Sequence, residues 1–207
     1  QVVNLLPCNN QWCIRNHSGE DCRADAVIIA GGHESPALVP VARQLRLKAI
    51  RGQVTELPEA DFNLPQTVIC GTKYLNPVQG GSAVTGATFD LKDETPYPTP
   101  AGHQENLDEL KRILPSVTKE SVPDPDQLQG RVAFRCTTHD YQPVAGHMRD
   151  TGGNHLNDLY LLTGLGSKGL VWAPLLAEYL ADVISGQPHC LPAPLSKRLE
   201  TGRLYRN

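Results

Sequence analysis

The sequence predicts a fold that combines an α/β layer with an α+β domain. Two apolar segments, 26–30 and 159–163, are each followed at once by glycine, a pattern typical of buried parallel strands. Between them, residues 48–89 hold short segments of alternating polarity separated by Pro, Asn and Gly, which indicates an antiparallel sheet. The pattern therefore changes from a first layer to an antiparallel domain near residue 48.

These changes of pattern set the expected domain boundaries. The 207 residues suit one large domain or one and a half small ones. We expect the first layer at 1–47 and 136–187, the antiparallel domain at 48–135 and a polar C-terminal tail at 188–207.

Individual elements follow from local periodicity. In the first layer we expect a strand at 12–15, a strand covered on both faces at 26–30 and a helix at 37–47. In the antiparallel domain the expected strands are 53–57, 67–70, 74–77 and 83–89, followed by a loop at 91–103.

The second half begins with an amphipathic helix at 104–114, which Pro115 ends. After it we expect a loop at 122–130, a strand at 131–135 and a mobile segment at 148–158, which is rich in Gly, Asn and Asp.

An apolar strand at 159–163 and a helix at 170–185 complete the layer. Gly186 supplies the C-terminal stop of this helix, and Pro174 is expected near its first turn because proline has no N–H to donate.

Charge and composition exclude several classes of protein. The net charge of −3 excludes binding to nucleic acid through bulk charge and leaves only a local patch. No segment approaches the roughly 20 apolar residues of a membrane span. The first residues lack a basic signal-peptide region, and the absence of an initiator Met suggests a fragment or a processed chain.

The six cysteines and seven histidines show no metal-ligand spacing, so no metal site is predicted. Irregularly spaced cysteines are typical of reduced thiols in a cytoplasmic protein, and we interpret each as a small buried apolar side chain.

Gly164, Gly166 and Gly169 match the G-x-G-x-x-G fingerprint of dinucleotide-binding proteins. A Rossmann unit needs a second strand after the helix, but here prolines follow it, so we reject that interpretation. Glycines and a helix N-terminus still suit a developing negative charge on a ligand. The alternative is a glycine-rich turn that serves packing alone.

Three other segments carry candidate site residues, each with a structural alternative. Gly31 and Gly32 allow a ligand to approach the backbone, or form a tight turn. Arg135 ends a strand and suits bidentate capture of a carboxylate, or lies at the surface. In the segment 51–53, Arg51 likewise could hold a carboxylate or lie at the surface.

Seven short segments occur in a fixed order along the chain. They are AVIIAGGH at 26–33, RGQV at 51–54, YLNP at 74–77, GATFD at 86–90, QENL at 104–107, RVAFRCTTHDYQP at 131–143 and GLGSKGLVWAPLLAE at 164–178. In this order the segments resemble the D-amino-acid oxidase / glycine oxidase superfamily of FAD proteins. Within it, they are most similar to the C-terminal oxidoreductase modules of bifunctional tRNA 5-methylaminomethyl-2-thiouridine biosynthesis proteins.

This resemblance implies a D-amino-acid oxidase-like fold: a partial FAD-binding, Rossmann-like layer and an antiparallel substrate domain. It also implies FAD-dependent removal of the carboxymethyl group from 5-carboxymethylaminomethyl-2-thiouridine at the tRNA wobble position, with hydride transfer to the flavin and release of glyoxylate. A methyltransferase domain that uses S-adenosylmethionine is expected elsewhere in the full-length protein.

The resemblance also assigns roles to residues. Arg135 matches the arginine that pairs with the substrate carboxylate, Lys168 stands where relatives usually have arginine, and Tyr74 is a candidate wall of the substrate pocket. The implied cofactor-binding residues are Gly31, Gly32, Gly52, Gln53, Gly164, Gly166, Ser167, Gly169 and Leu170.

The sequence departs from the family because the N-terminal G-x-G-x-x-G and its ribose-binding acid are absent. Two alternatives remain: an oxidase of a free small amino acid such as glycine or sarcosine, and a cofactor-free module that only binds tRNA or a partner. The basic residues of the tail could contact tRNA phosphates, but a solvated terminus is favoured because Glu200 interrupts a short patch.

Overall fold

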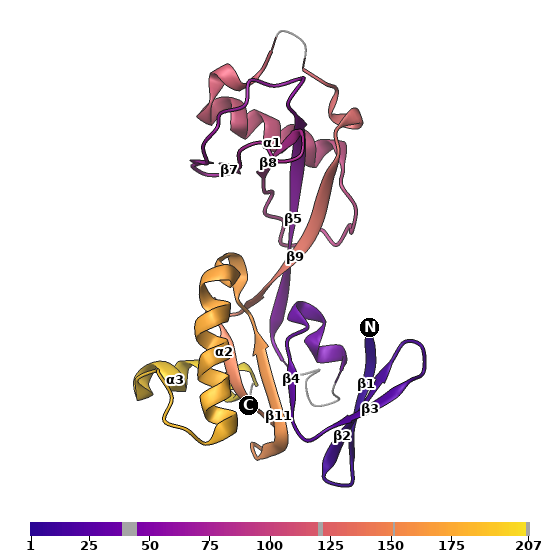
Figure 1. Cartoon of the computed structure of the whole chain (residues 1–207), viewed down its shortest axis with the longest axis vertical. Coiled ribbons are helices and arrows are strands. Elements are labelled where there is room, and N and C mark those ends of the chain that lie inside the picture. Colours follow the sequence, from indigo (N-terminus) through magenta and orange to yellow (C-terminus); the bar gives the residue numbers. More distant parts are fainter. Residues whose placement is uncertain (39–44, 120–121, 151, 206–207) are drawn as a thin grey trace. The chain divides into compact units, whose positions relative to one another are not determined.

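The computed structural model describes residues 1–38, 45–119, 122–150 and 152–205. The chain divides into two compact units, each of which is drawn in Figure 1. The first unit comprises Gln1–Ala49 and Arg135–Asn207, and the second comprises Ile50–Phe134.

The central sheet of the first unit joins segments far apart in the sequence. It has the order β10 (Val144–Arg149), β11 (His155–Thr163), β4 (Val27–Ile29). β11 and β4 run parallel, as the apolar segments predict, while β10 and β11 are antiparallel. The expected cover on both faces is wrong for β4, because Ile28 is 46% exposed.

A second sheet precedes this one in the chain. It is an antiparallel meander of β1 (Val2–Cys8), β2 (Gln11–Asn16) and β3 (Asp21–Ala24), of which the sequence predicted only the middle strand. The Trp12 indole N–H donates to the carbonyl of Asn157 at 2.9 Å and so ties the meander to β11. The sequence did not predict β1, because most of its residues are exposed and buried and exposed residues do not alternate along it.

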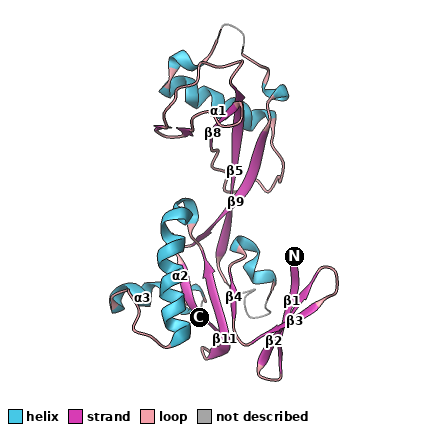
Figure 2. Ribbon diagram, in the orientation of Figure 1, coloured by secondary structure: helices cyan, strands magenta, loops and turns pink. Residues whose placement is uncertain are grey.

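Helices cover the central sheet (Figure 2). The 3-10 helix η1 (Gly32–Ala37) follows β4, and η5 (Gly166–Lys168) leads into α2 (Gly169–Ser185). Gly186 ends α2 in the left-handed conformation with φ 65°, as predicted. Pro174 lies one turn deeper in the helix than expected. Most of the helix expected at 37–47 lies outside the described residues, and Leu47 begins a strand.

Leu176, Tyr179 and Leu180 of α2 pack on Tyr160 and Ala145 of the sheet. This contact buries the apolar face of the helix, which is the main source of helix stability in a folded chain.

The segment expected as a polar tail has helical structure. Residues 188–205 contain α3 (Ala193–Leu199) and the 3-10 helix η6 (Thr201–Leu204), and they belong to the first unit. Leu204 is fully buried in its core, and Leu199 is buried beside α2. Two buried leucines in a polar segment anchor it, so the terminus is not simply solvated.

The segment 148–158, expected to be mobile, contains the end of β10 and the start of β11. Between these strands Arg149 donates to the carbonyl of Gly153 at 2.9 Å. Asp150 accepts from the backbone N–H of Asn154 at 2.8 Å. Asn and Asp act here as turn residues. Composition alone does not distinguish an ordered turn that is rich in Asn and Asp from a mobile loop.

The second unit contains the predicted antiparallel sheet, with antiparallel pairing in β6–β7, β7–β8 and β8–β5. Its order is β6 (Ile69–Cys70), β7 (Tyr74–Leu75), β8 (Ser82–Gly86), β5 (Leu47–Pro58), β9 (Gly130–Thr138). β5 enters this unit from the first, and β9 returns to the first.

Helix α1 (Pro100–Ile113) packs Leu107 and Leu110 against Leu57 and Leu75 of the sheet. It begins earlier than the predicted residue 104, because Thr99 caps it by accepting from the N–H of Gly102. The short 3-10 helices η3 (Pro115–Val117) and η4 (Pro125–Gln127) follow.

The docking of the C-terminal segment leads to a stability prediction. Leu204→Ala removes a fully buried side chain and should lower the free energy of unfolding by about 2–5 kcal/mol. Leu195→Ala is the matched control, because Leu195 is 50% exposed. Thermal unfolding of both variants checks this, and equal melting temperatures would contradict the docked segment.

Candidate active site

Three strand ends of the first unit meet at one edge of the central sheet. Thr163 ends β11, and its hydroxyl donates to the carbonyl of Gly32, just after β4, at 3.1 Å. The same Oγ1 lies 3.3 Å from Sγ of Cys136 on β9. The carboxyl ends of parallel strands are where α/β sheets place their ligand sites.

The turn after β11 requires glycine at two positions. Gly164 and Gly166 have φ values of 72° and 58°. A Cβ on Gly164 would lie 2.9 Å from Cγ2 of Thr138, and one on Gly166 would lie 3.4 Å from Cγ2 of Thr137. Close packing against the end of β9 is therefore one function of this turn, as the packing alternative predicted.

The same turn leads into α2 without a side-chain cap. The first N–H groups of a helix have no partner within the helix and carry a partial positive charge. Ser167, Lys168 and Leu170 are exposed here, with Leu170 at 96%. This surface suits a ligand that presents oxygen atoms or a partial negative charge.

Thr137 gives a second indication of a ligand at this place. Its Oγ1 is buried and has no hydrogen-bond partner among the described residues. Thr137 forms a bridge with Leu165 and lies beside Gly166. A buried hydroxyl without a partner costs free energy, so a ligand atom at this point would stabilise the site.

Cys136 lies under the same turn with 8% of its surface exposed. Burial raises the pKa of its thiol, although hydrogen bonds with Thr163 and the backbone of Gly164 act in the opposite direction. The thiol is therefore neutral at physiological pH and contributes packing to the site. By contrast, Cys22, Cys70 and Cys190 are exposed, so the prediction of buried side chains is wrong for them.

The two predicted cationic residues both belong to the first unit. Arg135 is partly buried on β9, and Lys168 is exposed at the turn before α2. Arg135 precedes Thr137 and Thr138 on β9, the two residues that contact Gly166 and Gly164 of the glycine turn. The end of β9, the glycine turn and the start of α2 therefore lie in one region.

The other predicted residues belong to the second unit. Tyr74 is partly buried on β7, where its carbonyl accepts from Thr85 Oγ1 at 2.8 Å. Gly52 and Gln53 are buried on β5.

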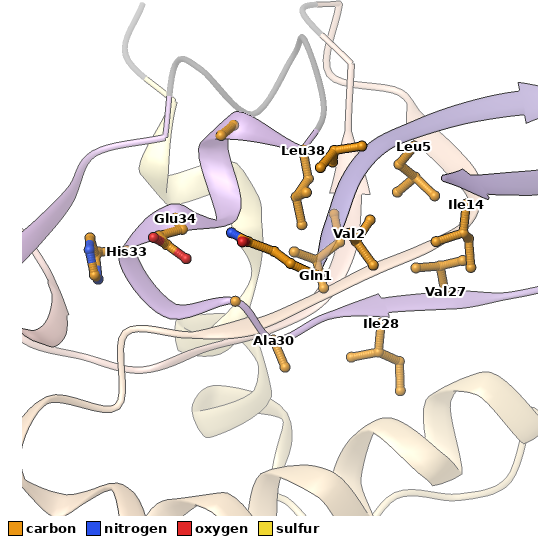
Figure 3. A pocket seen from close by; sticks show the side chains of 14 residues that line it. Gln1, Val2, Leu5, Ile14, Val27, Ile28, Ala30, His33, Glu34 and Leu38 are labelled. Atoms are coloured by element: carbon orange, nitrogen blue, oxygen red, sulfur yellow. The ribbon is translucent and has the colours of Figure 1, made fainter. Parts of the chain in front are cut away.

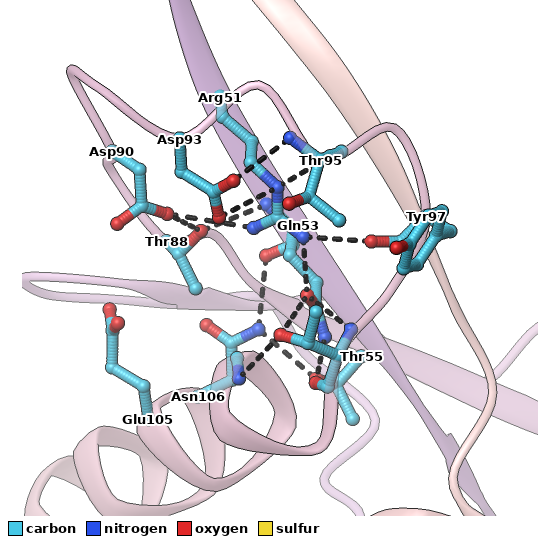
Figure 4. Close-up of polar contacts among 12 residues, drawn as sticks. Arg51, Gln53, Thr55, Thr88, Asp90, Asp93, Thr95, Tyr97, Glu105 and Asn106 are labelled. Atoms are coloured by element: carbon cyan, nitrogen blue, oxygen red, sulfur yellow. Dashed lines mark hydrogen bonds and ion pairs between the residues drawn. The ribbon is translucent and has the colours of Figure 1, made fainter.

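Gln53 is fully buried and bonded within its own unit (Figure 4). Its Oε1 accepts from Arg51 at 3.0 Å and from the N–H of Thr99 at 2.9 Å, while its Nε2 donates to the carbonyl of Thr99. The side chain of Gln53 is therefore used within its own unit, and a contact between Gln53 and the cofactor stays a prediction. Its polar side chain is used to fix the N-terminus of α1.

Arg51 is the centre of that network and is 1% exposed. It donates to the carbonyls of Thr95 and Tyr97 and forms ion pairs with Asp90 at 3.6 Å and Asp93 at 3.4 Å. These contacts hold the loop between β8 and α1 against β5. A guanidinium with several acceptors offsets the cost of burying its charge.

A cavity of about 770 Å³ lies in the first unit between η1, β4 and the meander (Figure 3). Its lining is mostly apolar, including Val2, Leu5 and Ile28, with Gly31, His33 and Glu34 at η1. Arg135 and the turn at 164–169 are not part of the lining. Gly31 lines the cavity, and the carbonyl of the next residue, Gly32, accepts from Thr163 at the start of the glycine turn.

Among the described side chains, no three His, Cys, Asp or Glu residues lie close enough to hold a metal ion. None of the helices in the described ranges is both long and apolar enough to cross a membrane.

The chain is similar to known flavin enzymes. A family model described as FAD dependent oxidoreductase matches residues 1–183. The tRNA 5-methylaminomethyl-2-thiouridine biosynthesis bifunctional protein MnmC of Marinobacter nauticus is 61% identical over 208 residues, which cover 100% of this chain and 33% of that protein. The MnmC of Pseudomonas paraeruginosa is 35% identical over 229 residues, which cover 98% of this chain and 35% of that protein. The chain thus spans about a third of the length of these relatives, and they confirm the resemblance seen in the sequence.

Solved structures show the same fold. Iminodiacetate oxidase from Chelativorans sp. BNC1 has a TM-score of 0.71 at 21% identity, covering 97% of this chain and 52% of that chain. Glycine oxidase from Bacillus cereus has a TM-score of 0.70 at 24% identity, and the match covers 92% of this chain and 51% of that chain. The predicted D-amino-acid oxidase-like fold class is confirmed.

The tight fit of Gly164 against Thr138 leads to a prediction. Gly164→Ala should destabilise the protein by about 1–3 kcal/mol from backbone strain, and further through the contact with Thr138 Cγ2. Thr138→Ser in the same chain removes that methyl group and should restore part of the melting temperature. Gly153→Ala is the control, because it has φ 86° but no atom within 4 Å of the added Cβ. An equal loss in Gly153→Ala and Gly164→Ala would contradict the packing role.

The raised pKa of Cys136 leads to a second prediction. Because the thiol holds its proton to higher pH than a free thiol, Cys136 should react with iodoacetamide at pH 8 much more slowly than the exposed Cys22 and Cys70. Peptide mass spectrometry of the native protein measures this, with the unfolded chain as the reference for equal reactivity. Labelling of Cys136 as fast as Cys22 would contradict its burial.

Proposed function

The chain belongs to the FAD dependent oxidoreductase family, and from that premise we propose that it is the oxidoreductase part of a longer protein that modifies the wobble uridine of tRNA. The observation that supports this most is the 61% identity, over the whole chain, to a bifunctional protein named for the biosynthesis of a tRNA thiouridine.

The proposed reaction removes the carboxymethyl group of 5-carboxymethylaminomethyl-2-thiouridine. This group and its amine form an N-substituted glycine, and two-electron oxidation of its C–H and N–H bonds gives an imine. Water then adds to the imine carbon and the C–N bond breaks, which yields glyoxylate and 5-aminomethyl-2-thiouridine. Bound FAD supplies the two-electron oxidation.

Arg135 is proposed to hold the carboxylate of this substrate. Its guanidinium offers paired N–H donors that match the two carboxylate oxygens, and it precedes by two and three residues the threonines of β9 that contact the glycine turn. Lys168, exposed at that turn, adds a second positive charge for the carboxylate or for the reduced cofactor. Tyr74 of the second unit remains a proposed wall of the substrate pocket.

The residues at the strand ends fit an FAD ring. The N–H groups of Ser167 in η5 and of Gly169 and Leu170 at the start of α2 would hold its carbonyl oxygens, and the buried hydroxyl of Thr137 would gain a partner. Gly31, Gly32, Gly164 and Gly166 leave room beside the backbone. Such preorganised N–H groups stabilise negative charge that develops during the reaction.

The longer protein would also carry a methyltransferase domain, as expected from the bifunctional name of its relatives. Its macromolecular partner would be tRNA with a modified wobble uridine, and its place of action the cytoplasm. The alternative substrate, a free small amino acid such as glycine or sarcosine, uses the same carboxylate contact and is separated from the first by the assay below. A cofactor-free binding module conflicts with membership of an FAD family.

The test is glyoxylate release from modified tRNA by the full-length protein. Arg135→Ala should lower kcat/KM by about 10²-fold or more, since a charge-assisted contact worth about 3 kcal/mol or more is lost. Arg135→Lys should retain part of the rate. Arg131→Ala is the matched control, because Arg131 is an exposed arginine on the same strand.

The outcomes separate the possibilities. Unchanged turnover in Arg135→Ala would remove the carboxylate role. Turnover of free glycine at a rate that rivals modified tRNA would favour the amino acid oxidase. A visible spectrum of the purified full-length protein without flavin absorption would contradict the oxidoreductase proposal altogether.

A further inference from the structure

An exposed aromatic side chain lies beside the site described above. Tyr141 follows β9 in the tight turn Thr138–Gln142 and is 61% exposed. Lys48, at the start of β5 in the same unit, places its Nζ over the Tyr141 ring, 5.6 Å from the centroid. An ammonium group at this distance from an aromatic face is a cation–π contact.

The turn that presents Tyr141 is firmly held. The carboxylate of Asp140 accepts from Thr138 Oγ1 at 2.7 Å and from the N–H of Gln142 at 3.1 Å. Arg203 forms an ion pair with Asp140 at 3.1 Å and also donates to the carbonyls of Gln142 and Pro143. Both backbone neighbours of Tyr141 are therefore anchored, and the ring projects from a fixed base.

This turn packs directly on the glycine turn of the candidate active site. The atoms nearest to an added Cβ on Gly164 are Thr138 Cγ2 and the carbonyl oxygen of Gln142, at 2.9 and 3.6 Å. Arg135, the proposed carboxylate partner, stands three residues before Thr138 on the same strand. Tyr141 thus belongs to the turn that packs on the glycine turn, where the modified nucleoside is proposed to bind.

The chemistry of the pair favours a nucleic acid as its occupant. An exposed aromatic ring stacks on any unpaired base, and a lysine beside it contacts the adjacent phosphate. The one acid in the turn, Asp140, is already paired with Arg203 and does not repel phosphate as a free carboxylate would. His139, also exposed in this turn, offers a further hydrogen-bond donor.

We propose that Tyr141 and Lys48 form a nucleotide-binding contact for the anticodon loop of the tRNA substrate. The Tyr141 ring stacks on an unpaired base next to the modified uridine, and the Lys48 ammonium binds a neighbouring phosphate. This inference rests on the proposed function, and it adds a local contact to a chain whose net charge of −3 gives no general attraction for RNA.

The test measures binding of unmodified tRNA to the full-length protein by fluorescence anisotropy, which does not depend on catalysis. Tyr141→Ala should raise Kd about tenfold or more, whereas Tyr141→Phe, which keeps the ring, should bind as the wild type. Lys48→Ala should weaken binding and reduce the dependence of log Kd on log salt by about 0.7, the contribution of one phosphate contact. Matched controls are Tyr97→Ala, at a tyrosine 65% exposed in the second unit, and Lys197→Ala, at an exposed lysine of α3.

Turnover distinguishes this contact from the proposed reaction. In Tyr141→Ala the KM for modified tRNA should rise while kcat stays the same, and oxidation of iminodiacetate, a small N-substituted glycine, should not change. If the wild type oxidises modified tRNA but Tyr141→Ala has the same Kd and KM, the contact is overturned and the proposed function stands. If the wild type neither binds nor oxidises tRNA, both are overturned.

Discussion

The hydroxyl of Thr163 joins the ends of three strands, and the geometry of the candidate site depends on this junction. It donates to the carbonyl of Gly32 after β4 and touches the thiol of Cys136 on β9. The glycine turn after β11 is thereby placed against the end of β9, where a Cβ on Gly164 would clash with Thr138. Buried polar contacts of this kind fix one arrangement of the strand ends, because each unmade bond would be costly.

Packing and the proposed ligand binding use the same glycines. Gly164 and Gly166 adopt positive φ values so that the chain can turn tightly against Thr137 and Thr138. The same turn delivers the uncapped start of α2 to the sheet edge, where its N–H groups are available to a cofactor. The structural and functional interpretations of a glycine-rich turn are therefore compatible here, since the tight turn is what places the helix N-terminus.

Apolar segments and helical periodicity in the sequence made much of the fold predictable. The apolar segments at 26–30 and 159–163 predicted the strands β4 and β11, which the structure pairs in parallel, and the apolar helix before Gly186 predicted α2. Elements with weak patterns were missed: β1 is mostly exposed, and the C-terminal segment is polar except for the leucines that dock it. Periodicity reports burial of one face, so an element with little buried surface leaves no signal.

The sequence by itself determined the family, through the order of its short segments, and the residue types that suit a glycine-like acid and a flavin. Tertiary structure decided which of them share a region. It brought Gly32, Cys136 and Gly164 together, and it committed Gln53 to the network of Arg51, where its amide groups are fully used. Spacing along the chain cannot distinguish a polar side chain that faces a ligand from one that bonds to its own backbone, because that difference depends on which distant segments the fold places beside it.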